Sequence, residues 1–407
     1  MRPKWPTPFP GANWLDQAEQ RAVLNVLRRG SLFRYYGPKP PTCVARLEAR
    51  ACAFYGAKYA LAVSSGTGAL MTSMLALGIG PGMEVVVPAF LWVSTVSAVV
   101  QANAVPVLAE VDDSLTLDPA DLARKITART RLVLPVHMAG APCDMKAILA
   151  VARRHRLPVL EDCAQANGGS FRGRKLGTFG DIGIYSFQIN KNVTAGEGGL
   201  LVTDRQDLFW RLAAAHDVGV PWKSAAPDAA AGLHLWGQGR RMGELAGAVA
   251  EVQLRKLPRI VRHMRRSNER LRAAVEGLPH VRLRRLNDPK GDTGPFLILI
   301  FDEAGRARRA AANLKTAGLS NSCRLADYGL HIYSNISALV RKVPLSPAGN
   351  PWSLPENVPL ARQYGQGACP QSDDLFRRSV LVAVPSRLTR PQERAMAAAV
   401  RRALTRA

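Results

Sequence analysis

Short apolar runs alternate with segments of helical pattern over residues 59–161, and this alternation constrains the fold more than any other feature. The apolar runs cover residues 59–63, 84–88, 105–109, 132–136 and 158–161. Helical patterns over residues 69–77, 94–102 and 145–154 lie between them. Continuous apolar strands alternating with helices are typical of a mostly parallel sheet with helices on both faces. The sequence therefore predicts an α/β fold with ligands bound beyond the carboxyl ends of the strands.

The pattern changes after about residue 240. A long helical stretch over residues 242–276 contains Pro258, where we expect a break. Strand-like and helical runs then alternate with a loop-rich stretch over residues 324–371. We predict a large domain over residues 1–245 and a smaller α+β domain over residues 246–407.

The chain has 55 Lys and Arg against 31 Asp and Glu, a formal net charge of +24. Such a charge attracts anions: a phosphorylated or nucleotide-linked substrate, an acidic carrier protein or nucleic acid. The alternative is basic residues spread over solvated helix faces. Basic residues of the second half recur at helical spacing and form no compact run interleaved with aromatic residues, so we expect no nucleic-acid partner.

The cysteines and the amino-terminal residues indicate the cellular compartment of the protein. The 6 cysteines form neither a C-x-x-C pair nor a metal-ligand spacing, which suits free thiols in a reducing compartment. The first residues lack the apolar run of a signal peptide, and no run approaches the roughly 18 apolar residues of a membrane span. We therefore expect a cytoplasmic protein without a metal or a membrane partner.

A turn of small residues follows the first predicted strand. Ser64, Ser65, Gly66, Thr67 and Gly68 end that strand and open a helix. Backbone N–H groups at a helix N-terminus favour a phosphate, and glycine allows close approach. Such turns are common, so the turn alone does not identify a ligand.

Two residues further along add specific chemistry. Asp162 ends a buried strand, where its carboxylate can keep a pyridine nitrogen protonated; the alternative is a helix N-cap. Lys191 stands on a glycine-rich loop and can form a Schiff base; the alternative is a surface lysine. A phosphate cradle, a carboxylate and a lysine in this order predict pyridoxal 5'-phosphate (PLP) as the cofactor, passing through its pyridoxamine form.

Three further residues are candidates for the same site. Gln165 can hydrogen-bond the phenolic oxygen of PLP, or it can be a surface amide. Ser186 follows the strand over residues 182–185 and can add a hydroxyl to the phosphate. Trp92 follows the strand over residues 84–88 and can stack on the ring, or it can belong to the core.

Two blocks together resemble a known family. These are Glu-Asp-x-x-Gln-Ala at residues 161–166 and Ser-Phe-x-x-x-Lys-Asn-x-x-x-Gly-Glu-Gly-Gly at residues 186–199. The chain resembles the DegT/StrS family of PLP-dependent aminotransferases, which have the aspartate-aminotransferase fold (fold type I). The resemblance implies Lys191 as the Schiff-base lysine and Asp162 at the pyridine nitrogen. It also implies Gln165 at the phenolic oxygen, Trp92 on the ring, and a phosphate site made by Ser65, Gly66, Thr67 and Ser186.

The resemblance further implies a homodimer with the active site at its interface. The implied reaction moves an amino group from glutamate or glutamine to a keto-sugar, a cyclitol or a related acceptor in two half-reactions. The alternatives are a PLP-dependent dehydratase or cyclase of sugar or natural-product biosynthesis, and a binding protein that retains the fold. In the dehydratase branch the lysine is replaced, so Lys191 argues against that activity.

One departure from the family pattern concerns the phosphate. Family members usually have an asparagine where this chain has Gly239, and that asparagine reaches the phosphate in the neighbouring subunit. Gln238 and Arg240 are candidates to replace it, and Arg240 is the better phosphate partner.

Overall fold

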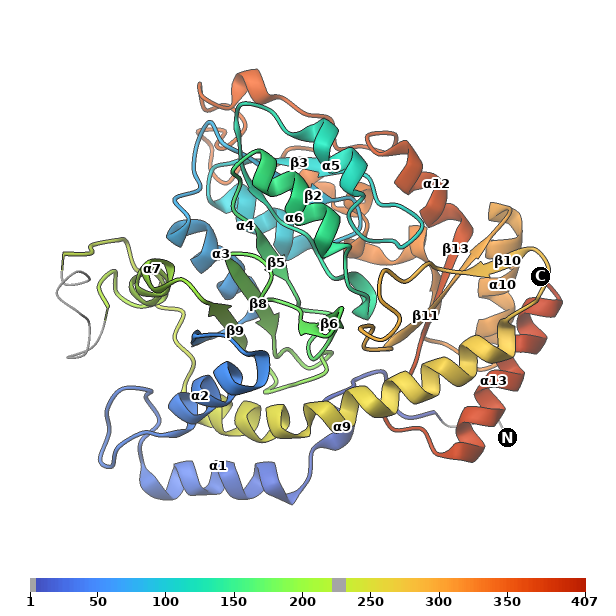
Figure 1. Ribbon diagram of the computed structural model, residues 1–407, viewed down its shortest axis with the longest axis horizontal. Helices are drawn as coiled ribbons and strands as arrows, with labels where there is room; N and C mark the ends of the chain where they lie inside the picture. The colour runs from blue at the N-terminus through green and yellow to red at the C-terminus, as the bar shows by residue number, and fades with distance from the viewer. Residues whose placement is uncertain (1–4, 222–231) are drawn as a thin grey trace.

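A mixed sheet forms the centre of the larger part of the molecule (Figure 1). The computed structural model describes residues 5–221 and 232–407. Two sheets, β1-β9-β8-β5 and β3-β2-β4, are joined by two parallel bridges, Val133 with Val159 and Val136 with Asp162. The strands are β1 (Tyr59–Val63), β2 (Glu84–Pro88), β3 (Val105–Ala109), β4 (Thr130–Val133), β5 (Leu160–Asp162), β8 (Ile182–Ser186) and β9 (Gly199–Thr203).

Strand direction brings the predicted site turns to one edge of this sheet. β9 is antiparallel to β1 and to β8, whereas β2, β3 and β4, and likewise β5 and β8, pair in parallel. All strands other than β9 therefore point the same way, and their carboxyl ends share an edge. The predicted α/β class with a mostly parallel mixed sheet is confirmed.

Alternate residues of each strand face opposite helical layers. In β1, Leu61 and Val63 belong to one apolar cluster, and Ala60 and Ala62 belong to the other. The first cluster includes side chains of α3 (Gly66–Ala76), α4 (Val93–Gln101) and α7 (Gln206–His216). The second includes side chains of α2 (Cys43–Tyr55), α5 (Pro119–Lys125), α6 (Met145–Arg154) and α9 (Glu244–Val275). Burial on both faces explains why the strands read as continuous apolar runs.

α9 is one helix of 32 residues that contains Pro258, so the predicted break is wrong. Proline removes one helical hydrogen bond and crowds the preceding turn, at a cost of about 3 kcal/mol. Packing at both ends outweighs this cost: Leu254 and Leu257 are buried against the large sheet, and Leu271 is buried in the second core. Fully burying one such side chain contributes about 1.5–3 kcal/mol. Figure 1 shows α9 running beneath both parts of the molecule.

A second, antiparallel sheet has the order β10-β11-β13-β12. Its strands are β10 (Val281–Leu283), β11 (Phe296–Phe301), β12 (Ser322–Arg324) and β13 (Ser379–Ala383). The end of α9, α10 (Ala304–Thr316) and α13 (Arg390–Thr405) supply its core. This is the expected α+β part. The boundary at residue 245 stays a prediction, because α9 passes through it.

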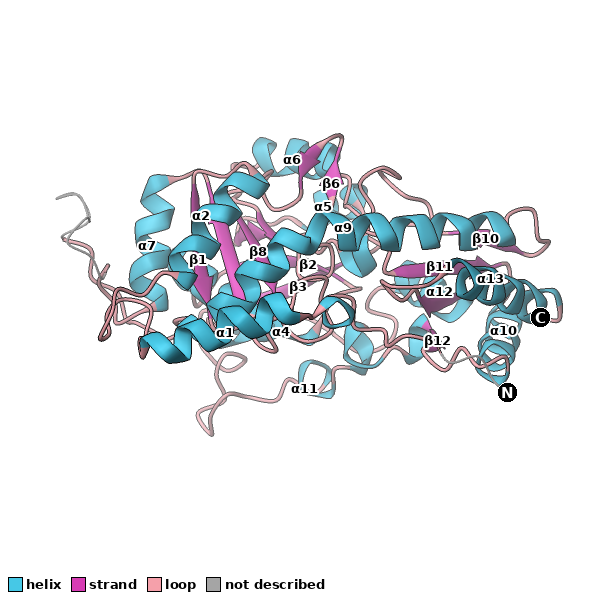
Figure 2. Cartoon of the chain, turned by 90° about the horizontal axis from the view of Figure 1, so that it is seen from below, coloured by secondary structure: helices cyan, strands magenta, loops and turns pink. Residues whose placement is uncertain are grey.

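The remaining elements lie around these two sheets. α1 (Gln17–Arg29) packs along α9 (Figure 2). Trp5 packs against the core of the second sheet, as does the carboxyl-terminal Ala407. The other elements are β6 (Ser170–Phe171), β7 (Arg174–Lys175), α11 (Ser337–Val340), α12 (Pro370–Arg378) and short 3-10 turns, three of which lie at residues 325–335.

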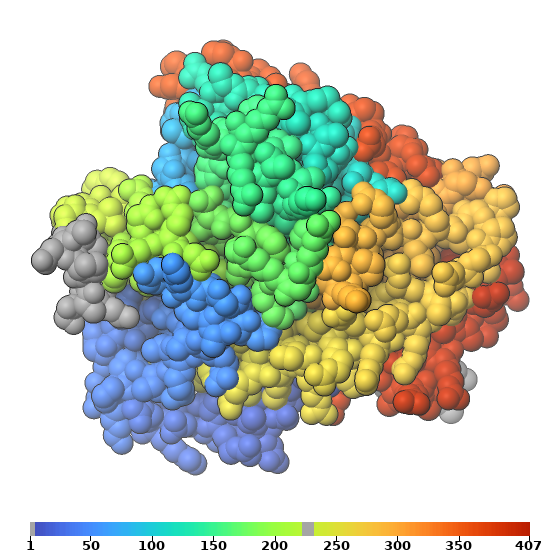
Figure 3. Space-filling view, viewed as in Figure 1, coloured from blue at the N-terminus to red at the C-terminus, as the bar shows by residue number. Residues whose placement is uncertain are grey.

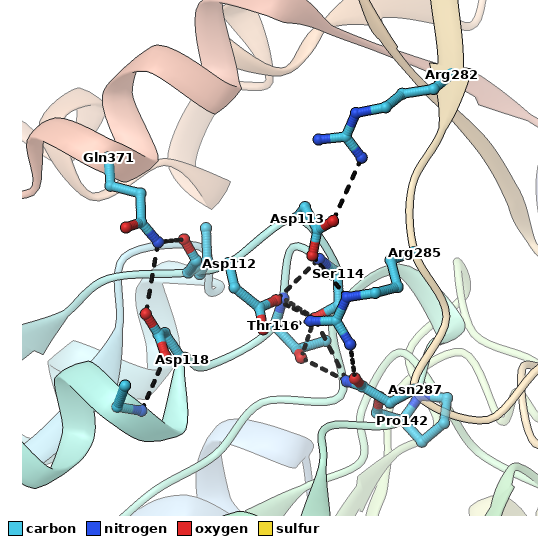
Figure 4. A network of polar contacts seen from close by, with 12 residues as sticks. Asp112, Asp113, Ser114, Thr116, Asp118, Pro142, Arg282, Arg285, Asn287 and Gln371 are labelled. Carbon is cyan, nitrogen blue, oxygen red and sulfur yellow. Dashed lines mark hydrogen bonds and ion pairs between the residues drawn. The ribbon is translucent and has the colours of Figure 1, made fainter.

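A polar network holds the loop after β3 against the second part of the chain (Figure 4). Arg285 donates to Asp113 over 2.6 Å. Asn287 donates to Thr116 over 3.2 Å and to the Pro142 carbonyl over 3.1 Å. Each half-exposed ion pair contributes little alone, but the network spans three segments and fixes their relative position.

All 6 cysteines are free thiols. Among the helices formed by residues 5–221 and 232–407, none has both the length and the apolar character that a bilayer span requires. The expectation of no signal peptide rests partly on residues 1–4, which lie outside the described residues.

Buried His216 predicts an acid-sensitive stability. Its Nδ1 lies 2.6 Å from the Ala213 carbonyl oxygen, and burial together with the Arg34 charge lowers the pKa of His216 to about 4. An unfolded histidine has a pKa near 6.5, so between about pH 6.5 and 4 only the unfolded chain binds this proton. The free energy of unfolding should therefore fall by about 1.4 kcal/mol per pH unit as the pH drops through this window.

Urea unfolding from pH 7.5 to 5 measures this change in the free energy of unfolding. His216→Asn keeps a hydrogen-bond donor for the Ala213 carbonyl but has no titrating ring, so it should remove this pH dependence. If the unfolding free energy of the variant falls with pH as steeply as that of the wild type, His216 is not its source.

Candidate active site

The carboxyl edge of the large sheet opens into a cavity of about 480 Å³. The structure brings every predicted site residue to it: Ser65, Gly66, Thr67, Trp92, Asp162, Gln165, Ser186 and Lys191 all line it. These residues come from the ends of β1, β2, β5 and β8 and from the loop after β8. The shared direction of those strands is the reason that they meet. The role of each residue remains a prediction.

The N-terminus of α3 forms one wall. Ser65 is its N-cap, and the Ser65 hydroxyl accepts a hydrogen bond from the Gly68 N–H over 2.9 Å. The N–H groups of Gly66 and Thr67 occupy the first two helical positions and have no acceptor within the helix. The Thr67 hydroxyl lies 2.8 Å from the Ser94 hydroxyl. Two N–H groups without an intrahelical acceptor, at the positive end of a helix dipole, suit a phosphate.

Gly66 is needed because α3 approaches β8 closely. A Cβ at position 66 would lie 2.7 Å from the Ser186 Cβ. The Ser186 hydroxyl accepts from the Gln188 N–H over 3.3 Å, which leaves its hydrogen free to donate into the cavity. The close approach therefore places two kinds of hydrogen-bond donor, the N–H groups of α3 and the Ser186 hydroxyl, side by side.

Gly66→Ala should separate these donors and weaken PLP binding at least about fivefold, because overpacking displaces backbone at a cost of about 1–3 kcal/mol. Equilibrium dialysis of PLP against the apoprotein measures the affinity. Gly305→Ala is the matched control, since Gly305 also lies in the first turn of a helix and its Cβ would make only an ordinary contact at 3.6 Å. Equal PLP affinity in both variants would contradict the assignment.

Asp162 presents a buried carboxylate to the cavity. Its Oδ2 accepts from the Thr95 hydroxyl over 3.1 Å, and its Oδ1 accepts from the Ala164 N–H over 3.0 Å. No helix begins after it, so the N-cap alternative is wrong. Burial raises the pKa of Asp162, against the effect of the two hydrogen bonds and of the Lys191 charge. Among the described residues, the side-chain partners of Asp162 are the Thr95 hydroxyl and the Ala164 N–H and include no cation; a protonated pyridine nitrogen would supply one.

Lys191 stands on a loop whose backbone is held from two sides. Its N–H donates to the Gln188 carbonyl over 3.0 Å, and its carbonyl accepts from the Gly11 N–H over 2.9 Å. Nζ makes no hydrogen bond or ion pair with any residue that the structure describes, and the half-buried side chain lines the cavity. Burial lowers the pKa of Lys191, against the opposing charges of Asp162 and Glu197. A lowered pKa makes the neutral, nucleophilic amine more available.

Gln165 and Trp92 are also placed to meet a ring. Gln165 Oε1 accepts from the Ala139 N–H over 3.1 Å, so the amide nitrogen is left to donate to a ligand. Trp92 is 38% exposed and lies on the cavity wall, which excludes the core alternative.

Sequence reasoning missed two aromatic residues of the site. The His331 ring lies 4.6 Å from Trp92 and stacks on Tyr328 at 4.0 Å between ring centroids. Burial lowers the pKa of His331 to about 4, so the ring is neutral near pH 7. Both residues belong to the segment predicted as loop-rich, far from the other site residues in the chain. Their aromatic character was the one signal available.

Below Asp162, Glu161 anchors the end of β5. Its carboxylate accepts from the N–H groups of Gly177, Phe179 and Gly180 over 2.9, 2.6 and 2.7 Å. It also faces His137 Nε2 at 3.1 Å. The His137 Nδ1 accepts from the Cys143 N–H, so Nε2 carries the hydrogen and donates to Glu161. These contacts position the neighbouring Asp162.

Arg240 does not line the cavity, and neither does Gln238. Arg240 Nε donates to Gln238 Oε1 over 2.9 Å, and its side chain packs against the first turn of α3. Its role as a replacement for the family asparagine therefore stays a prediction.

Arg240→Ala should lower PLP affinity about tenfold, because the variant would lose a charge-assisted hydrogen bond to the phosphate. Equilibrium dialysis measures this, with Arg240→Lys as the variant that keeps the charge. Unchanged affinity in Arg240→Ala would refute the role.

Residues 13–324 match the sequence profile of the DegT/DnrJ/EryC1/StrS aminotransferase family. A putative L-glutamine:3-amino-2,3-dideoxy-scyllo-inosose aminotransferase of Micromonospora echinospora is 40% identical over 253 residues, which are 62% of this chain and 58% of that protein. The L-glutamine:2-deoxy-scyllo-inosose aminotransferase of Streptoalloteichus tenebrarius is 39% identical over 263 residues, 63% of this chain and 60% of that protein. The matches span less than two thirds of each relative's length.

The fold is shared over the whole chain with a solved structure. S. venezuelae DesV, solved in complex with a ketimine intermediate, superposes with a TM-score of 0.80 and 27% identity. The superposition covers 100% of this chain and 99% of DesV.

Proposed function

Because the chain belongs to the DegT/DnrJ/EryC1/StrS aminotransferase family, we propose that it is a PLP-dependent aminotransferase. The proposed reaction moves an amino group from L-glutamine, or from glutamate, to a keto-cyclitol or keto-sugar. The observation that carries this proposal is the meeting of Lys191, Asp162 and the N-terminus of α3 in one cavity. The names of the two relatives support glutamine as donor and a keto-cyclitol as acceptor. They favour transamination over the dehydratase or cyclase alternative.

The residues present fit PLP. Gly66 and Thr67 would hold the phosphate through their N–H groups, with the Ser186 hydroxyl beside them. Asp162 would accept a hydrogen bond from the pyridine nitrogen, and Gln165 would donate to the phenolic oxygen. Trp92 would cover the ring. When bound, PLP supplies an electron sink for negative charge on the substrate α-carbon.

The chain itself supplies proton transfer and a dry environment. Lys191 Nζ, with its lowered pKa, can take a proton from the substrate α-carbon and later return one. Asp162 would hold the ring nitrogen protonated, because a pyridinium would supply the cation that favours the carboxylate form of Asp162. Val136, Met138 and Phe296 line the cavity with apolar surface, which excludes water and strengthens these electrostatic effects.

The proposal includes a homodimer with a shared active site. Within the described residues, Lys191 is the one Lys or Arg side chain lining the cavity, so a donor carboxylate has no arginine or second lysine to pair with in one subunit. The chain also exposes large apolar side chains that a partner would cover: Leu24 and Leu27 of α1 are 48% and 52% exposed, and Trp236 is 91% exposed. The free cysteines suit the proposed cytoplasmic setting.

Isotope transfer tests the proposed reaction. The holoenzyme is incubated with L-glutamine labelled with ¹⁵N at the α-amino group and with 2-deoxy-scyllo-inosose, and the products are analysed by mass spectrometry. We expect the label in an amino-cyclitol. Parallel reactions use keto-sugars in place of the cyclitol as acceptor, and glutamate in place of glutamine as donor. PLP binding with no label transferred to any ketone, but with dehydration or cyclisation of the acceptor, would favour the alternative.

A further inference from the structure

A second cavity, of about 390 Å³, lies on the outer face of α9. α2 contributes Phe54 to it, β7 contributes Lys175, and α9 contributes the rest of its charged rim. Figure 3 shows these three segments meeting on the visible face, in blue, green and yellow. None of its lining residues belongs to the candidate active site.

Uncompensated positive charge distinguishes this cavity. Lys175, Arg262, Arg265 and Arg266 line it, against one carboxylate, Glu269. None of the four cations makes a hydrogen bond or an ion pair with any residue in the described ranges. Two other arginines of the same helix are paired with carboxylates: Arg255 with Glu251 at 3.1 Å, and Arg270 with Glu393.

The fold holds these like charges together. Arg262, Arg265 and Arg266 are three and four residues apart on α9 and therefore share one face. Lys175 approaches from β7, with its ammonium 4.5 Å from the centre of the Phe54 ring. Burial and the Arg265 charge lower the pKa of Lys175. Bringing an anion among these groups relieves their mutual repulsion.

We propose that this cavity is a binding site for a phosphate ester, with the phosphate among Lys175, Arg262, Arg265 and Arg266 and the organic group against Phe54. Guanidinium groups bind phosphate oxygens in a forked geometry. Phe54, Leu257 and Val261 give the cavity an apolar wall, which a bare inorganic ion would not use. The volume lies in the range of small-molecule sites. The site is independent of the proposed transamination.

Calorimetric titration of the holoenzyme tests this site, because bound PLP fills the phosphate cradle of the active site. The probes are phenyl phosphate and inorganic phosphate at low ionic strength. We expect both to bind, and phenyl phosphate to bind more tightly because its ring covers Phe54. Lys175→Met and Arg266→Met should each weaken phenyl phosphate at least about tenfold.

Arg402→Met is the matched control, since Arg402 is exposed near the end of α13 and makes no ion pair among the described residues. Circular dichroism of each variant establishes that it is folded. Equal weakening in the control would mean a general charge effect and would overturn the site. Absence of binding by both phosphates would also overturn it, and salt-sensitive retention on duplex DNA in that case would identify a polyanion surface instead.

Discussion

Replacement of Lys191 by alanine is expected to lower the rate of amino-group transfer by at least about 10⁴-fold. Nζ is both the proposed attachment point for the cofactor and the base that moves the substrate proton, and loss of a general base alone costs about 10²–10⁴-fold. Stability should change little, because Nζ makes no hydrogen bond or ion pair with any described residue. Turnover with L-glutamine and a keto-cyclitol measures the rate, and thermal unfolding measures the stability.

The matched control is Lys290→Ala, which removes an exposed lysine outside the cavity. It should retain wild-type turnover. Methylamine added to Lys191→Ala supplies a small base and should restore part of the lost rate. A Lys191→Ala protein that transaminates at the wild-type rate would refute the assignment.

Asp162→Asn should lower turnover by about 10³-fold in a protein that still folds. A carboxylate about 4 Å from a pyridinium stabilises it by roughly 4 kcal/mol at an effective dielectric constant of about 20, and this converts to about three powers of ten in rate. The neutral amide cannot hold the ring nitrogen protonated. The value of kcat with saturating donor and acceptor measures the effect, and Asp207→Asn, at an exposed ion pair with Arg205, is the control.

The stability of the same variant separates this role from a structural one. Burial raises the pKa of Asp162 in the folded chain, so ionisation of this group opposes folding at pH values above its unfolded pKa. Replacing it with a neutral amide of the same shape should leave the free energy of unfolding of the apoprotein unchanged or higher. The Thr95 hydroxyl and the Ala164 N–H can both still pair. Near-normal kinetics, or a variant that fails to fold, would contradict the proposed role.

The sequence predicted the existence of the buried strands, because burial on both faces leaves a continuous apolar run. The bounds of two were shifted: β4 (Thr130–Val133) begins two residues before the predicted run 132–136, and β5 (Leu160–Asp162) begins two residues after the start of 158–161. β1, β2 and β3 occupy the residues predicted for them, 59–63, 84–88 and 105–109. The antiparallel direction of β9 was not predictable, because direction depends on where the chain returns and not on apolar pattern. The continuity of α9 through Pro258 was missed because packing against two cores outweighs a local preference.

In the candidate site, too, residues with a local sequence signal were predicted and residues placed only by tertiary packing were not. Residues at strand ends were predictable, because parallel strands deliver their carboxyl ends to one edge, and the predicted residues all reach the cavity there. Tyr328 and His331 come from a segment without regular periodicity, so nothing local indicated that His331 contacts Trp92 or that Tyr328 stacks on His331. The basic cavity on α9 was hidden for a similar reason, since Lys175 is far from Arg262 in the chain.

The absorbance spectrum of the purified protein with PLP, recorded before and after L-glutamine is added, tests the central proposal most directly. We predict a visible band from cofactor bonded to Lys191 that is lost on adding L-glutamine and returns when a keto-cyclitol follows. Lys191→Ala should lack the band from the start. A wild-type protein that stays colourless in PLP, or whose band does not respond to glutamine or glutamate, would contradict the proposed aminotransferase.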